Sequence, residues 1–164
     1  MEILDQPGWL WGLSLIVLTM AIHATAVVML AFVGVRMRGS LETLDLTVWK
    51  LIPILICEVG VFGLLLAVLH GFECVIWAAA YLWLGALDSP LDALFFSLDS
   101  MSTRGASGLT LQRPWRLMGA LEAVDGMLLF GVSTAYLFSV MQVYWSILTA
   151  HAAPQRTAAG VAPE

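Results

Sequence analysis

The chain has 164 residues, of which 60% are hydrophobic and 12% charged, and its mean hydropathy is +0.91. A soluble domain is about 45–50% apolar and about 25% charged, so this composition is that of an integral membrane protein. The formal net charge of -5, from 12 acidic and 7 basic residues, excludes the basic surface that binds nucleic acids or anionic lipids.

The first predicted element is a membrane span over residues 9–35, roughly 27 residues against the ~20 that cross the hydrocarbon layer. Trp9 and Trp11 are interfacial aromatics at its start, and Arg36 and Arg38 follow its end in the loop RMRGSLETLD. Arginines just after a span mark the cytoplasmic side. We therefore expect the N-terminus outside and the C-terminus in the cytoplasm.

The second apolar stretch covers residues 46–87, which as one helix would be about 60 Å long at 1.5 Å per residue. One upright crossing uses only about 30 Å of that length. Pro53 offers a break because proline removes a backbone hydrogen bond. Two readings follow: one long helix kinked near Pro53, or two separate spans. The scarcity of turn residues between Gly63 and Gly85, apart from HGFE, favours the single helix.

A short helix is predicted over residues 89–102, in DSPLDALFFSLDSMST. Ser89 is a candidate N-cap, Pro90 suits the first helical position and Asp92 lies near the positive end of the helix dipole. About a dozen apolar residues are too few to cross a membrane, as in re-entrant segments. The glycine-containing loop at 103–113 needs protein or water around it, because irregular backbone is not tolerated against lipid.

The last predicted span begins at Pro114 and Trp115 and extends over residues 114–149. Residues 150–164, HAAPQRTAAGVAPE with the preceding alanine, are rich in alanine and proline and are predicted to be a disordered tail.

The order of span, short capped helix, glycine loop and span, with ALFFSLDSMSTRG and PWRLMGALEAVDGMLLFGVSTAYLF, resembles the pore module of the potassium channel superfamily, including its small bacterial two-pore-domain-like members. The resemblance covers about half of the chain, from His70 to Trp145. It implies an all-α membrane fold with an outer helix (46–87), a pore helix, a filter loop and an inner helix. Residues 1–45 would add an N-terminal transmembrane helix and a cytoplasmic loop. Gly126 falls about where the family's hinge glycine lies, and Gly131 is a second candidate.

The resemblance fails at the selectivity filter. In potassium channels four TVGYG loops replace the water shell of the ion with backbone carbonyls. The aligned residues here are Thr103, Arg104, Gly105, Ala106, Ser107 and Gly108. The aromatic has become Ala106 and the second glycine Ser107, whose Cβ restricts the backbone. We therefore expect an atypical TRGAS filter with weak or no preference for potassium.

Arg104 has two readings. Four copies in a pore would form a ring that favours anions. Alternatively, Arg104 pairs behind the filter with Asp99, at a position where some members of the family hold a carboxylate. An unpaired Asp99 in that wall would be costly, so we favour the pair.

Ionisable residues at membrane depth indicate function by default. His70 and Glu73 share one helix face, as do Glu122 and Asp125 on the last span. A hydrogen-bond network between helices is the simpler reading. A metal or proton site is the other, but helical-bundle metal sites generally use two Glu-x-x-His copies, which the chain lacks. We predict no metal here and interpret His23 as a packing histidine.

Together these features predict a homotetramer in the cell membrane that passively conducts small inorganic ions. Its partners would be its own copies, lipid and the permeant ion, with no nucleic acid, no cofactor and no enzymatic activity. The rival readings are a non-conducting scaffold or regulator with the same fold, and a protein with an intramembrane metal or proton site.

Overall fold

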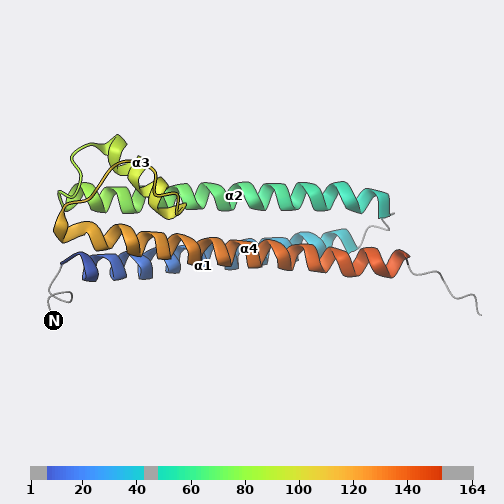
Figure 1. Ribbon diagram of the computed structural model, residues 1–164. Helices are drawn as coiled ribbons and strands as arrows, with labels where there is room; N and C mark the ends of the chain where they lie inside the picture. The colour runs from blue at the N-terminus through green and yellow to red at the C-terminus, as the bar shows by residue number, and fades with distance from the viewer. Residues whose placement is uncertain (1–6, 43–47, 153–164) are drawn as a thin grey trace, which may run out of the picture.

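The computed structural model describes residues 7–42 and 48–152, which form four α-helices and one 3-10 turn (Figure 1). The elements are α1 (Pro7–Glu42), α2 (Val48–Trp83), α3 (Pro90–Met101), the 3-10 turn η1 (Arg113–Trp115) and α4 (Arg116–Ala152). Helices α1, α2 and α4 are long rods that lie side by side, and α3 packs on α2 and α4 at one end of the bundle. The predicted all-α class is confirmed for the part of the chain that the structure describes.

Three of these helices are long and apolar enough to cross a membrane. The candidate spans are Pro7–Met37, Trp49–Trp83 and Arg113–Trp145. Many of their large apolar side chains are exposed on the single chain, as expected for surfaces that face lipid or other copies. The helices are longer than ~20 residues and therefore extend beyond the hydrocarbon layer or tilt within it.

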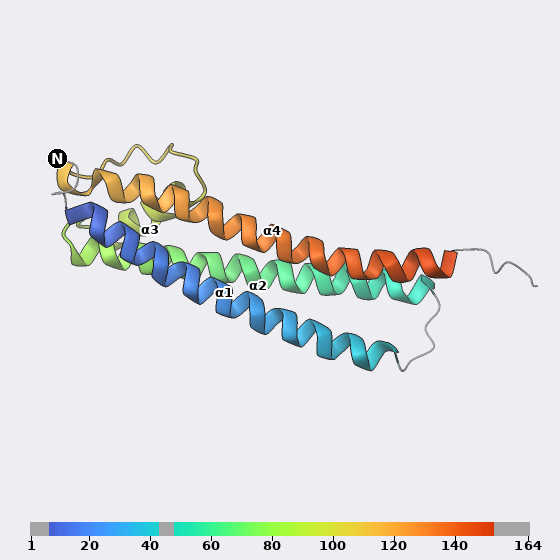
Figure 2. The same cartoon turned by 90° about the horizontal axis from the view of Figure 1, so that it is seen from below.

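Helix α1 approaches α4 closely because two glycines, one turn apart, face it. A β-carbon at Gly8 would lie 2.6 Å from the carbonyl oxygen of Pro114, and one at Gly12 would lie 2.5 Å from Leu121 Cδ1. Small residues at this spacing let membrane helices approach closely. Figure 2 shows α1 beside α4 at this end and diverging from it toward the other.

Helix α2 is a single helix, as favoured above. It continues through Pro53 from Val48 to Trp83, somewhat shorter than the predicted 46–87. Proline in the interior removes one backbone hydrogen bond, and the long helix tolerates this loss. The reading with two separate spans is wrong.

Helix α3 begins as its cap residues predict. Ser89 is extended (φ -105, ψ 127), its hydroxyl accepts from the Asp92 backbone N–H at 3.4 Å, and Pro90 opens the helix. The helix then ends after Met101, where Thr103 takes a left-handed conformation (φ 57).

Helix α3 reaches about half of the way across a membrane-sized layer. Its last residue, Met101, contacts α4 at Gly126. Gly126 lies ten residues after Arg116, or about 15 Å along the helix. The hydrocarbon layer is ~30 Å thick, so the loop that follows α3 starts near mid-depth and returns to the end where α4 begins (Figure 1).

Two predicted boundaries differ from the structure. The loop expected at 36–45 is helical up to Glu42, because the single breaker in this stretch, Gly39, costs a helix only about 1 kcal/mol. Helix α4 continues to Ala152, past the predicted end at 149. The rest of the predicted disordered tail, residues 153–164, lies outside the described residues.

The first testable prediction is the topology. If Arg36 is cytoplasmic, the opposite end of the bundle, with α3 and its loop, is outside. In a chain with Cys57 and Cys74 changed to serine, we expect Ser40→Cys to react with an impermeant maleimide from the cytoplasmic side only. Asp88→Cys should react from the outer side only. Protection of position 40 from the cytoplasmic reagent would reject this topology.

Candidate functional site

The loop between α3 and η1 combines exposed polar residues with an unusual backbone. Residues 102–106 and Gly108 are exposed on the single chain. Thr103, Gly105 and Gly108 have φ angles of 57, 62 and 72 degrees. Left-handed backbone is free for glycine but costs a β-branched residue of order 1–2 kcal/mol. Such strain persists where surrounding contacts impose it, and it clusters at functional sites.

Asp99, on the last turn of α3, imposes much of that conformation. Its Oδ1 accepts from Arg104 Nε at 2.6 Å, and its Oδ2 accepts from the Ser107 backbone N–H at 2.8 Å. Its own carbonyl accepts from the Arg104 backbone N–H at 3.0 Å. One buried carboxylate therefore ties two points of the loop to the helix.

The predicted contact between Asp99 and Arg104 is confirmed by this geometry. The carboxylate side is 3% exposed and the arginine side 55% exposed, so the pair is desolvated on one side only. The Arg104 guanidinium also lies 5.5 Å from the ring centre of Phe95, within cation–π range. The hydrogen bond from Arg104 lowers the pKa of Asp99 to about 2, with help from the loop backbone N–H groups, so Asp99 is ionised at neutral pH.

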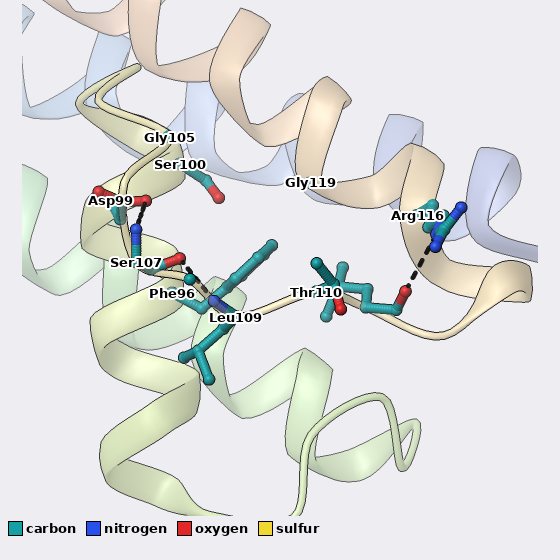
Figure 3. A pocket seen from close by; sticks show the side chains of 11 residues that line it. Phe96, Asp99, Ser100, Gly105, Ser107, Leu109, Thr110, Arg116 and Gly119 are labelled. Carbon is teal, nitrogen blue, oxygen red and sulfur yellow. Dashed lines mark hydrogen bonds between the residues drawn. The ribbon is translucent and has the colours of Figure 1, made fainter.

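A hollow of about 510 Å³ lies between the loop, α3 and the start of α4 (Figure 3). Asp99 and Ser107 face it from one side, and Arg116 borders the other, where its Nε donates to the Leu111 carbonyl at 3.4 Å. The hollow is lined by Phe96, Asp99, Ser100, Gly105, Ser107, Gly108, Leu109, Thr110, Leu111, Arg116 and Gly119.

The ionisable residues predicted at membrane depth are all buried in a polar layer between the helices, as two groups with separate partners. On α4, Glu122 accepts from the Tyr81 hydroxyl at 2.7 Å and from Ser97 of α3. One turn further, Asp125 Oδ2 accepts from Thr19 at 2.6 Å and from Trp77 Nε1 at 3.0 Å. Glu122 and Asp125 thus connect α4 to the other three helices.

His70 and Glu73 lie deeper and have a separate set of partners. Glu73 Oε1 is 2.9 Å from His23 Nδ1, and Glu73 Oε2 is 3.3 Å from His70 Nδ1. Both histidine Nε2 atoms approach the hydroxyl of Ser133, at 3.0 Å for His23 and 3.2 Å for His70. The predicted network between helices is present, and it draws on α1 as well as α2 and α4.

Sequence reasoning missed two members of this group. His23 was interpreted as a packing residue, yet its imidazole bridges Glu73 and Ser133. The available signal was its charge-bearing side chain in the middle of an apolar span. Ser133, within FGVSTA, had no signal beyond its position in the last span.

The two candidate hinge glycines differ in their surroundings. A β-carbon at Gly126 would lie 2.1 Å from the Met101 carbonyl oxygen, whereas one at Gly131 would meet nothing within 4 Å. Gly126 is therefore a site of close contact between α4 and the end of α3. Whether either glycine is a hinge stays a prediction.

The fold and these residues indicate a multi-pass helical membrane protein. Its described part has three candidate spans, a short helix that reaches about half of the way across a membrane-sized layer, and a buried layer of ionisable side chains. No protein-family model, curated protein or solved structure matches the chain.

Proposed function

We propose that the protein conducts ions passively as a homotetramer, through a pore bordered by the 102–112 loops of its copies. The observation that carries the proposal is the exposure of this loop beside α4, whose contact with the end of α3 lies about 15 Å from the start of α4, half of a ~30 Å hydrocarbon layer. Backbone N–H and C=O groups cannot face lipid there, so other copies or a water-filled path would cover them. The resemblance to the potassium channel pore module, between His70 and Trp145, points to the same assembly.

The attachment of the loop to α3 supports this proposal. Asp99 binds the Arg104 side chain and the Ser107 backbone N–H, and the loop contains three residues with left-handed backbone. Because Arg104 is paired with Asp99, each copy contributes a nearly neutral ion pair to the loop. This favours the pairing behind the filter over a ring of free arginine charges.

The direct test is ion flux from liposomes that contain the purified protein, together with its mass in detergent micelles. We expect a tetramer and a flux that Gly105→Val reduces, because a β-branched residue at φ near 62 degrees is strained by about 1–2 kcal/mol where glycine is not. Ala106→Val is the matched control. It adds the same side chain at the next exposed position, where the backbone is not left-handed, and should retain flux. A folded wild-type tetramer without flux in any salt would favour the non-conducting scaffold.

A second prediction concerns selectivity. The TRGAS sequence lacks the TVGYG array of carbonyls, so we expect less than a tenfold preference for potassium over sodium. The measurement is the reversal potential of a planar bilayer with potassium on one side and sodium on the other. A value near the potassium equilibrium potential would contradict the prediction.

A further inference from the structure

Three metal-ligating side chains from two helices converge in the buried polar layer. His23 of α1 and His70 and Glu73 of α2 each offer a nitrogen or oxygen atom, and the three atoms lie within 4.8 Å of one another. All three residues are at least nine-tenths buried. No part of the proposed conduction path uses them.

The four polar contacts of this group need one more hydrogen than its neutral imidazoles and hydroxyl carry, when Glu73 is ionised. Two neutral imidazoles carry one N–H each and the Ser133 hydroxyl carries one O–H, three hydrogens in all. Four contacts need one each: two between imidazole and Glu73, and two between imidazole and Ser133. Whatever the tautomers, one contact brings two lone pairs together.

The missing hydrogen corresponds to one contact in the structure, the one between His70 and Glu73. His70 Nδ1 and Glu73 Oε2 are buried, 3.3 Å apart, and neither has a hydrogen-bond partner among the described residues. A buried polar atom without a partner costs about 1–3 kcal/mol, and a charged one costs more. A cation between the two atoms satisfies both and offsets the carboxylate charge.

We propose that His23, His70 and Glu73 bind a divalent transition-metal ion of the zinc class. Two imidazole nitrogens and one carboxylate oxygen form a donor set that such ions prefer, whereas magnesium and calcium prefer oxygen alone. Tetrahedral bonds of about 2.0–2.1 Å place neighbouring ligand atoms about 3.3–3.4 Å apart. The two nitrogen–oxygen distances, 2.9 Å to Glu73 Oε1 and 3.3 Å to Glu73 Oε2, lie near this value, and the three ligand atoms lie within 4.8 Å of one another.

Ser133 fits this role as a supporting residue. Metal binding through both Nδ1 atoms leaves an N–H on each Nε2, and one hydroxyl oxygen has two lone pairs to accept both. Metal-bound histidines usually donate their other N–H to such a partner, which fixes the ring orientation. The mismatch in hydrogens is thereby removed at both ends of each imidazole.

His70 is the least buried member of the site on the single chain. The ring of Phe130 stacks on His70 with centroids 4.3 Å apart, and Phe130 itself is 47% exposed. Three protein ligands also leave a fourth tetrahedral position open for water or another small ligand.

The test is metal binding by the purified full-length chain after treatment with a chelator. We expect one Zn²⁺ per chain after gel filtration, a visible Co²⁺ spectrum of tetrahedral type and a rise of several degrees in the Tm with Zn²⁺. Mg²⁺ at the same concentration should do none of these. Less than a tenth of an equivalent of Zn²⁺ on folded wild-type protein would overturn the proposal and leave a shared proton as the compensating charge.

Matched variants separate this site from other zinc ligands in the chain. His70→Gln and Glu73→Gln should each weaken Zn²⁺ binding by at least about tenfold, and Ser133→Ala by about tenfold or more. The controls, His151→Ala and a chain with Cys57 and Cys74 changed to serine, should bind Zn²⁺ as the wild type does. If the controls lose the metal, or if both Gln variants keep it while folded, the assignment is wrong. Failure of ion flux would leave these outcomes unchanged.

Discussion

Asp99→Ala is expected to destabilise the protein by about 2–4 kcal/mol and to release the 102–112 loop. The substitution removes two hydrogen bonds to an ionised, buried carboxylate, each worth about 1.5–3 kcal/mol before the chain relaxes. Asp99→Asn should cost about half as much, because an amide oxygen still accepts from the Ser107 N–H. Thermal unfolding of the purified protein in detergent measures both effects.

Arg104→Ala should cost less than Asp99→Ala, on the order of 1 kcal/mol, because the guanidinium is more than half exposed. The double variant should cost less than the sum of the two single variants, since the shared ion pair is lost only once. Strictly additive effects would contradict the pairing. A pore-lining Arg104 would give another pattern, with unchanged stability and a shift of permeation toward cations.

The same pair predicts a dependence on pH. The folded-state pKa of Asp99, about 2, lies below the ordinary value of 3.8, so its ionisation stabilises the fold fully above about pH 4. This contribution is lost as the pH falls through the folded pKa. The difference in stability between wild type and Arg104→Ala should therefore shrink from pH 5 to pH 2. A difference that stays constant over this range would argue against the ion pair.

The helices were predictable because their signals are local. Long apolar runs predict the spans, and Ser89, Pro90 and Asp92 predict the start of α3 to within one residue. Their ends were less predictable. Helix α1 passes through Arg36 to Glu42, since arginine and glutamate are good helix formers and a single glycine is a weak stop signal.

The candidate sites show the same division between local and distant contacts. Asp99 and Arg104 are five residues apart, on either side of the C-terminal end of α3. The sequence and the family resemblance were sufficient to predict their pairing. The bond from the Ser107 N–H was not predictable, because it depends on the left-handed loop backbone. His23 is 50 residues from Glu73, so their contact arises only from how α1 packs in the bundle. Periodicity within a single helix carries no information about that packing.

Gly126→Ala is expected to be the most disruptive single-methyl change in α4. The added β-carbon would lie 2.1 Å from the Met101 carbonyl oxygen and 2.8 Å from its carbonyl carbon. These are backbone atoms at the end of α3, so no side-chain rotation relieves the clash. Overpacking of this kind costs about 1–3 kcal/mol, and here α3 would have to shift and move the start of the loop with it.

Gly131→Ala is the control for this change, five residues further along the same helix. Its β-carbon meets nothing within 4 Å in the described chain, and alanine favours a helix over glycine by up to about 1 kcal/mol. We therefore expect Gly126→Ala to lower the Tm of the protein and to reduce flux, while Gly131→Ala leaves the Tm unchanged or higher. Equal effects of the two substitutions on the Tm would show that helix propensity, and not the contact with Met101, decides the outcome. A hinge at Gly126 makes a different prediction: Gly126→Ala would keep the Tm and alter only the flux.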